Sequence, residues 1–600
     1  MQSRRAFLAQ SGTMLAAQNR QRPNILWISC EDMSPQLGCY GDPLAITPNL
    51  DKLATQSVRY TNAHSIIGVC APSRSGIITG IYPTSLGTLH MRCDAKIPEQ
   101  VRCFPEFLRK AGYYCTNNVK TDYNFKHPKS SWDDVSRTAH WKNRPAGQPF
   151  FAVFNNTVTH ESHLPLRGKK QLADTPRVKD SERRDPAKVR VPPYYPDTPE
   201  VRRDLANVHD TITQMDYDSG GLLRELEEAG LAEDTIVFFW SDHGVGLPRA
   251  KRWLYGSGTR VPLLVRVPAK FRRPGQGTPA TVNDELVSLI DLGPTVLNLA
   301  GVPVPAYMQS RAFLGPNLKP RRKFLYGARD RMDERYDMVR MVFDGRYRYI
   351  RNFDHDRPHY QYMNTPEKGP AMRDLRRLHD AGKLHEQADR YFRPKPVEEL
   401  YDSQNDKHEV TNLAARPEHK ARLESMRKEL FAWMRDIRDM GFIPEPEIMR
   451  MEAQYGNRMA ILRAPENATL LDDLIALENA SQADLRKALQ SKHVAVRARA
   501  ALKIRGAGVE MEGGLTDDSA TVRIAAAKTL VRIPVLVKEL AGHPDPWTRL
   551  AAAQALDELG EKARPALEAL RKARKDENRY VARVANHAVN ALSGANGEVA

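Results

Sequence analysis

Short apolar runs of strand length recur through the first half of the chain and indicate buried strands. They occupy residues 24–29, 150–154, 235–240 and 262–267. Apolar runs of this length, bounded by polar residues, are typical of parallel strands that are covered on both faces. Residues 217–229 instead repeat apolar positions with helical spacing and stop at Gly230. We therefore predict an α/β sandwich around a mostly parallel sheet.

Polar pairs follow three of these runs. They are Glu31 with Asp32, Thr159 with His160, and Asp242 with His243. The carboxyl ends of parallel strands share one edge of the sheet, and ligands bind beyond that edge. We therefore expect the three pairs to meet in one site.

The middle of the chain changes character twice. Residues 164–199 are polar and rich in proline, which predicts a long loop over one edge of the sheet, where it would shape a substrate pocket. From residue 320 to 440, arginine-rich strand-like segments such as 347–351 precede a helix predicted for residues 418–439. This order predicts a smaller α+β subdomain after the main domain.

The last part of the chain repeats itself every 26 residues. Arginine precedes a run of small residues at Val496-Arg497, Val522-Arg523 and Thr548-Arg549, with a looser copy at Ala582-Arg583. Self-similarity at such a period predicts stacked helical pairs, and the pattern resembles HEAT repeats. Either the repeats serve packing and stability, or they offer a docking surface for a protein partner or a polymer.

The N-terminus carries a twin-arginine pair, Arg4-Arg5, followed by apolar residues and a small-residue stretch at 15–17. Such a segment predicts export of the folded protein to the periplasm or the exterior, and a disordered basic terminus is the alternative. The predicted parts are this N-terminal segment (1–21), the α/β domain (22–319), its C-terminal subdomain (320–445) and the helical repeats (460–600).

Composition narrows the class of protein. With 41% hydrophobic residues and no apolar run long enough for a bilayer, the chain predicts several globular domains and no membrane span. The 90 Lys and Arg residues outnumber the 73 Asp and Glu residues, for a formal charge of +17. This charge either attracts polyanions or keeps a basic surface solvated. Six cysteines without a CxxC pair argue against a zinc ribbon.

Cys70 has the most informative surroundings of the six cysteines. Arg74 lies four residues later, so a helix opened by Pro72 and Ser73 places its guanidinium beside the cysteine, at the positive end of the helix. Such a position stabilises an anion on residue 70. A small buried side chain without chemistry is the alternative.

Residues 70–80, CAPSRSGIITG, resemble the signature of type I sulfatases, Cys-x-Pro-Ser-Arg followed by Thr-Gly. The likeness extends over roughly residues 22–415 and implies an alkaline phosphatase-like fold. It also implies that a formylglycine-generating maturation enzyme oxidises Cys70. In the family, one hydroxyl of the hydrated aldehyde attacks sulfur and the other later expels sulfate, a route that an ordinary serine lacks.

The resemblance also implies one divalent cation, usually calcium, held by hard oxygen ligands. The matching positions are Glu31, Asp32, residue 70, Asp242 and His243, of which the last two stand in a Ser-Asp-x-Gly motif. Two of these positions depart from the family. Glu31 stands where aspartate is more common, and His243 stands where asparagine is common, so either can change the metal preference.

The groups expected around the sulfate are also given by the resemblance. His160 matches the histidine that protonates the leaving group, while Lys120 and Lys251 match lysines that bind sulfate. Asp122, however, stands where the family has a histidine. A carboxylate donates a proton only when its pKa is raised, so either His160 acts alone as the acid or Asp122 contacts the sugar.

Residues 191–216 are similar to heparan N-sulfatases (N-sulfoglucosamine sulfohydrolases), which implies a sulfated carbohydrate without deciding between N- and O-sulfate. His90 and Arg92 follow the signature helix, and each either contacts this substrate or has a structural role. No nucleic acid partner is expected.

Two rival interpretations stay open. A phosphatase or phosphonate monoester hydrolase of the same superfamily would share the carboxylates and the metal. A catalytically dead scaffold would instead bind polyanions through its basic charge and its repeats.

Overall fold

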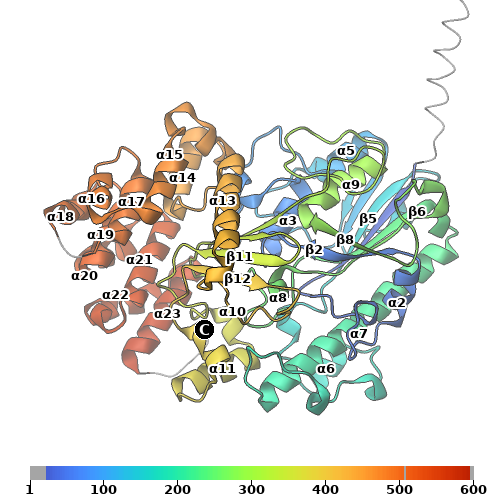
Figure 1. The fold of residues 1–600 in the computed structure, drawn as a ribbon, viewed down its shortest axis with the longest axis horizontal. Coiled ribbons are helices and arrows are strands. Elements are labelled where there is room, and N and C mark those ends of the chain that lie inside the picture. The colour runs from blue at the N-terminus through green and yellow to red at the C-terminus, as the bar shows by residue number, and fades with distance from the viewer. Residues whose placement is uncertain (1–21, 506–507, 595–600) are drawn as a thin grey trace, which may run out of the picture.

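The computed structural model describes residues 22–505 and 508–594, so the predicted signal segment at 1–21 lies outside the described residues. The main domain is built on an eight-stranded sheet in the order β4-β3-β5-β1-β6-β7-β2-β8 (Figure 1). Its strands are β1 (Asn24–Cys30), β2 (Val58–His64), β3 (Tyr114–Asn118), β4 (Asp134–Val135), β5 (Phe150–Asn156), β6 (Thr235–Ser241), β7 (Leu263–Arg266) and β8 (Thr281–Ser288).

The predicted parallel sheet is confirmed for three of the four apolar runs. Strand β1 pairs in parallel with β5 on one side and β6 on the other. The fourth run forms β7, which is antiparallel to both β6 and β2, so its predicted direction is wrong. The chain leaves β6 at the carboxyl edge of the sheet and enters β7 from that same edge. The two strands are therefore antiparallel, and such a connection needs no crossover helix.

Both faces of the sheet are covered, as continuous apolar strands require. Along β1, Ile25 and Trp27 pack toward α3 (Cys70–Thr79), α5 (Pro105–Lys110) and α9 (Leu292–Leu299). Leu26 and Ile28 belong to the opposite core, with α2 (Pro48–Thr55) and α7 (Pro199–Glu228). The alternation of side chains along one strand therefore joins two cores.

Helix α7 (Pro199–Glu228) begins well before the predicted start at residue 217. In the first half of α7, polar side chains that face the proline-rich segment 164–199 are buried, and this obscures the helical pattern in the sequence. Asp204 pairs with Arg167, and Asp210 pairs with Arg183, from that segment. The segment itself forms short helical turns, including α6 (Lys169–Asp174), and lies against α7.

A second, antiparallel sheet of four strands follows in the order β12-β11-β10-β9. Its strands are β9 (Leu325–Arg329), β10 (Val339–Phe343), β11 (Tyr347–Asn352) and β12 (Glu398–Asp402), and α13 (Lys420–Ile437) packs on β10 and β11. The helix predicted at 418–439 is thereby confirmed.

The repeated arginines explain why the helical module is periodic. Helices α17 (Val494–Lys503), α19 (Ala520–Leu530) and α21 (Pro546–Glu558) pack in succession, and α23 (Arg579–Ser593) follows. In each of the first three, the arginine donates to backbone carbonyls five and six residues earlier, as Arg523 does to Asp517 and Asp518. The turn before each helix is thus closed by the same contact.

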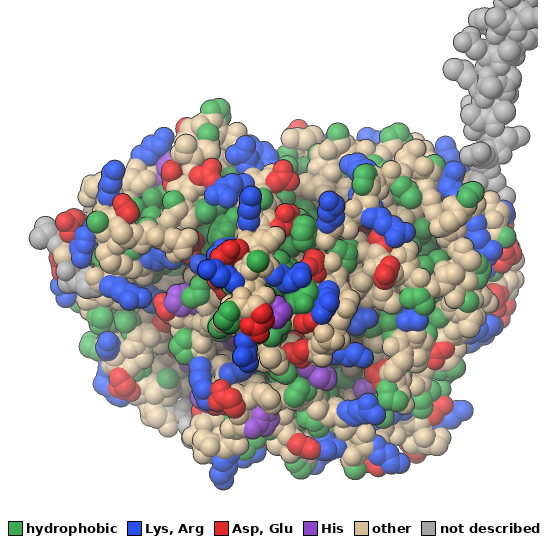
Figure 2. Space-filling view, viewed as in Figure 1, with side chains coloured by type: hydrophobic (Ala, Val, Ile, Leu, Met, Phe, Trp, Pro, Cys, Tyr) green, Lys and Arg blue, Asp and Glu red, His purple; other side chains and the backbone are tan. Residues whose placement is uncertain are grey.

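The helical module shares a core with the rest of the protein. One cluster of buried apolar side chains extends from the start of α3 through α13 to α19. On the face drawn in Figure 2, Lys and Arg side chains are scattered among acidic ones over both parts. Within the described residues, none of the helices has both the length and the apolar character to cross a bilayer.

A buried ion pair ties the second sheet to the residues after α13, and its loss should destabilise the protein. Arg340 is fully buried, and its Nε and Nη2 donate to Asp439 at 2.6 and 2.8 Å. We expect Asp439→Ala to lower the free energy of unfolding by about 3–5 kcal/mol, because it leaves a buried guanidinium without its main partner. Denaturant unfolding followed by tryptophan fluorescence measures this change.

The matched control is Asp472→Ala, which removes an exposed partner of Arg435 in α13. It should change the free energy of unfolding by less than about 1 kcal/mol. Equal effects of the two variants would contradict the role given to the buried pair.

Candidate active site

The polar pairs predicted from the strand ends meet at the carboxyl edge of the main sheet. Glu31 follows β1, and its backbone N–H donates to Asn156 O at the end of β5 (3.2 Å). Asp242 follows β6, and its N–H donates to Cys30 O (3.3 Å). Because the strand pairing continues past the last strand residues, these acidic side chains lie side by side.

Cys70 is the first residue of α3, so the helix begins two residues before its predicted start at Pro72, and the Cys70 side chain is buried. Burial raises the pKa of its thiol, and this effect outweighs the lowering by His243, Lys120 and Lys251. Two residues earlier, a Cβ on Gly68 would lie 2.7 Å from Trp253 O, so glycine allows the loop after β6 to approach Cys70. The encoded thiol is therefore held protonated inside a crowded polar site.

Arg74 joins the ends of three neighbouring strands. Its Nε donates to Asp242 Oδ2 at 3.0 Å, and its Nη1 donates to Asn155 Oδ1 at 2.9 Å. Its Nη2 lies 3.7 Å from Glu31 Oε1. The guanidinium thus neutralises both acidic strand ends from a position one turn after Cys70 on the same helix.

Lys120 and Asp122 approach the same site from the loop after β3. Lys120 Nζ lies 2.7 Å from Glu31 Oε1 and 3.9 Å from Asp122 Oδ2. Asp122 is also a group whose charge raises the pKa of the Cys70 thiol. The aspartate at this unusual position is therefore part of the site, beside the predicted sulfate-binding lysine.

Lys251 and His160 form a contact pair on the other side of the cluster. Lys251 Nζ lies 2.7 Å from Asp32 Oδ2 and 3.2 Å from His160 Nε2. An ammonium group only donates hydrogen bonds, so His160 Nε2 accepts. Burial, together with the charge of Lys251, lowers the pKa of His160. The lysine therefore carries the proton in this pair.

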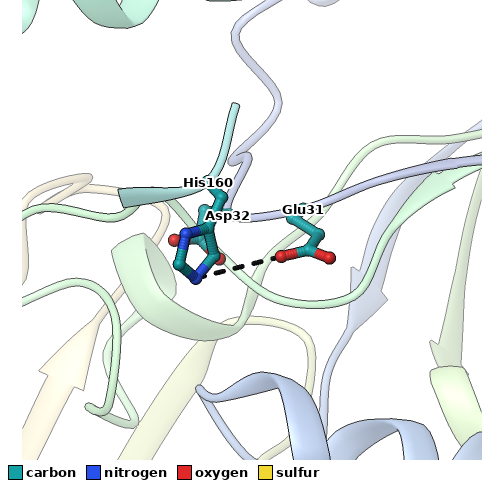
Figure 3. A group of neighbouring side chains, drawn as sticks. All are labelled: Glu31, Asp32 and His160. Carbon is teal, nitrogen blue, oxygen red and sulfur yellow. Dashed lines mark ion pairs between the residues drawn. The ribbon is translucent and has the colours of Figure 1, made fainter. Parts of the chain in front are cut away.

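Two overlapping groups of side chains are suited to hold a cation. The ligand atoms of Glu31, Asp32 and His160 lie within 4.8 Å of one another, and so do those of Asp32, Asp242 and His243. Figure 3 shows His160 turned toward Glu31, with Nε2 3.9 Å from Oε2. Asp32 Oδ1 and His243 Nε2 are buried 3.1 Å apart without hydrogen-bond geometry.

These side chains fit a hard divalent cation, because buried carboxylate oxygens converge and some lack a donor. Four of the five predicted metal positions belong to the two groups. His160 joins them unexpectedly, while Cys70 lies beside them through its interaction with His243.

The two residues predicted after the signature helix separate in the structure. Arg92 is exposed, and its guanidinium has no hydrogen bond or ion pair within the described part of the chain. The charges of Asp122 and Cys70 raise its pKa against the effect of burial. His90 is completely buried, and its Nδ1 accepts from Arg331 N.

Sequence reasoning missed three charged residues behind Lys251. Glu161 Oε1 lies 2.9 Å from Lys251 Nζ, and both Glu161 oxygens accept from Arg252 at 2.8 Å. Arg252 in turn lies 3.0 Å from Asp333 Oδ2. The first two residues directly follow His160 and Lys251 in the sequence, which was the available signal, but nothing in the sequence connects Asp333 with them.

Comparisons with known proteins show which families the chain resembles. Residues 23–302 match the family model described as Sulfatase, and residues 511–593 match the one described as HEAT repeats, which confirms the predicted repeat type. An ulvan-active sulfatase of Formosa agariphila is 40% identical over 488 residues, covering 74% of this chain and 80% of the relative. N-sulphoglucosamine sulphohydrolase of Homo sapiens is 28% identical over 471 residues, covering 70% and 91%.

Solved structures support the fold. One, connected with the metabolism of multiple glycosaminoglycans by Bacteroides thetaiotaomicron, superposes with a TM-score of 0.54 at 20% identity, covering 70% of this chain and 97% of that one. A 2-O glycosaminoglycan sulfatase gives a TM-score of 0.51 at 17% identity, covering 70% and 93%. The predicted fold class is confirmed, and the 40% identity to a relative covered over most of its length shows that this chain belongs to the sulfatase family.

Proposed function

We propose that this protein hydrolyses sulfate esters or sulfamates on a sulfated carbohydrate through a formylglycine made from Cys70. The observation that carries the proposal is the position of Cys70 at the start of α3, against a buried cluster of acids, lysines and histidines. A helix start stabilises negative charge on residue 70. The raised thiol pKa argues against the unmodified cysteine as nucleophile.

The proposed catalyst arises outside the encoded sequence. A formylglycine-generating maturation enzyme would oxidise the Cys70 side chain to an aldehyde, and the hydrated aldehyde would supply the attacking hydroxyl. Because two hydroxyls are present on one carbon, the second supplies the internal elimination that releases sulfate. The chain's own residues then bind the sulfuryl group and move protons.

Lys120 and Lys251 are the proposed sulfate ligands. They lie on opposite sides of the acidic cluster, at Glu31 and Asp32 respectively, and can offer positive charge to the sulfuryl oxygens. Lys251 in contact with His160 is a proton source for the departing oxygen or nitrogen. This pair supplies the acid function without a histidine at position 122.

A calcium ion is the proposed metal. Glu31, Asp32, Asp242 and His243 would hold it, with the modified residue 70 beside them. When bound, it would stabilise the ionised hydroxyl and the negative sulfuryl oxygens.

The names of the relatives and the exposed Arg92 support the proposed substrate class. The matched relatives are named for ulvan and for N-sulphoglucosamine, both carbohydrates. Arg92 adds an exposed cation whose pKa is raised by the charges of Asp122 and Cys70, and such a cation suits an anionic sugar chain. We further propose that the protein is located in the periplasm or outside the cell, where such polysaccharides occur.

A substrate panel tests the proposed reaction. We expect sulfate release from N-sulfated or O-sulfated glucosamine disaccharides or from ulvan fragments, and little phosphate release from phosphate and phosphonate monoesters. Ion chromatography of released sulfate and phosphate measures both. Faster hydrolysis of the phosphorus esters would support the phosphatase alternative, and no hydrolysis by protein carrying modified Cys70 would support the inactive scaffold.

A lysine substitution tests the proposed sulfate contacts. Lys120→Gln should lower kcat about 100-fold, because it removes one positive charge from the developing transition state. Lys126→Gln changes an exposed lysine of the same loop and should leave kcat unchanged. Steady-state kinetics with the best substrate of the panel would refute the assignment if both variants behaved alike.

Metal removal tests the proposed calcium site by activity and by stability. Chelation should abolish sulfate release, and added calcium should restore it and raise the melting temperature, because a ligand that binds only the folded state stabilises it. Asp32→Asn should remove this calcium-dependent rise. Asp174→Asn, which alters a carboxylate in the peripheral pair with His163, should keep it. A melting temperature independent of calcium in the unaltered protein would contradict the site.

A further inference from the structure

Residues 331–335, named here the bridging loop, form a tight turn between β9 and β10. Met332 and Arg335 close it with two backbone hydrogen bonds of 2.9 and 3.0 Å. Asp333 and Glu334 lie at its tip, and Asp333 has a positive φ of 46°. These two hydrogen bonds hold Asp333 and Glu334 in one closed turn.

One side of the bridging loop is held by the helical repeats. Arg335 Nη1 lies 2.6 Å from Asp557 Oδ2 of α21, and both side chains are buried. His587 Nδ1 of α23 lies 2.7 Å from Asp557 Oδ1 and so orients this carboxylate. Gln554 donates to the Glu334 carbonyl at 2.7 Å. The repeats thus bind both the Arg335 side chain and the backbone of the bridging loop.

Cation–π contacts also join the bridging loop to the repeats. The Arg331 guanidinium lies 4.3 Å from the ring centre of Trp547 in α21 and 5.1 Å from that of Tyr580 in α23. Its Nη2 donates to Met91 O, and Met91 N donates back to Arg331 O. The residue before Arg92 is therefore also fixed through the repeats.

The other side of the bridging loop faces the active site. Asp333 Oδ2 accepts from Arg252 Nε and Nη2 at 3.1 and 3.0 Å. Arg252 holds Glu161 with two hydrogen bonds, and Glu161 lies 2.9 Å from Lys251 Nζ. This chain of charged contacts is almost entirely buried, so solvent screens it little.

We propose that α21 and α23 position the sulfate-binding Lys251 through the bridging loop. Asp333 would shift if the repeats released the loop, and Arg252 and Glu161 would then no longer fix the ammonium. The proposal rests on the proposed function for the role of Lys251, but the mechanical coupling does not. Under this proposal Asp557 is a positioning residue. The sequence alone identifies the module that contains it only as helical repeats.

One face of the repeats lies against the rest of the chain. A cavity beside the repeats is lined by repeat residues such as Trp547 and Leu550, and by residues outside them such as Arg331 of the bridging loop and Phe442 after α13. Two of the ion pairs around it cross the junction, Arg357 with Glu558 and Arg499 with Asp354. This face of the repeats is therefore used for contact within the chain.

The test compares Asp557→Asn with Asp576→Asn in the full chain. Both variants remove the charge from an aspartate that a buried or half-buried arginine contacts, but Asp576 pairs with Arg549 inside the repeats. We expect Asp557→Asn to lower kcat about tenfold or more on the smallest active substrate, with KM changed less than about twofold, because misplacement of a catalytic group acts on the reacting step. Asp576→Asn should leave both constants unchanged.

Hydrogen exchange supplies a readout that does not need activity. Amides of residues 246–256, the segment with Lys251, should exchange faster in Asp557→Asn and at the unaltered rate in Asp576→Asn. If the unaltered protein releases no sulfate, the proposed function fails, and the exchange comparison still decides the coupling.

Two results would overturn the proposal: unchanged exchange and kcat in Asp557→Asn, or equal changes in both variants. Should Asp557→Asn not accumulate as folded protein, Arg583→Gln removes a weaker contact with Glu334, 3.4 Å long, and should cause smaller changes in the same direction.

Discussion

Parallel pairing of β5, β1 and β6 is the constraint on which the site depends. It places acidic residues from two adjacent strand ends next to each other, out of solvent. Buried carboxylates are costly unless opposite charges surround them. Arg74, Lys120 and Lys251 provide these charges, and each comes from a different segment. Two of these cations, Lys120 and Lys251, are also the proposed sulfate ligands.

Charge balance also explains why distant segments are joined to the site. Lys251 is shared by Asp32 and Glu161, and Glu161 needs Arg252, which in turn binds Asp333. Each of these buried charges therefore requires an opposite charge as its neighbour. The resulting series of ion pairs ends at Asp333 in the bridging loop, which the helical repeats contact. A module that looks separable in the sequence is in this way connected to the catalytic edge of the sheet.

The sequence predicted what local pattern and motif encode. Apolar runs revealed the strands, and the signature at residue 70 located the site. An apolar run does not encode direction, so β7 was assigned wrongly. The first half of α7 was missed because polar side chains such as Asp204 are buried against another segment. Asp333 was not found, since its role depends on a turn brought close by tertiary packing. The domain boundaries and the roles of the site residues stay predictions.

Mass spectrometry of the peptide containing Cys70, from a preparation that releases sulfate, tests the central claim most directly. The account predicts that residue 70 carries an aldehyde or its hydrate in place of the thiol, and that the modified fraction rises with specific activity. An active preparation in which residue 70 is entirely unmodified cysteine would contradict it.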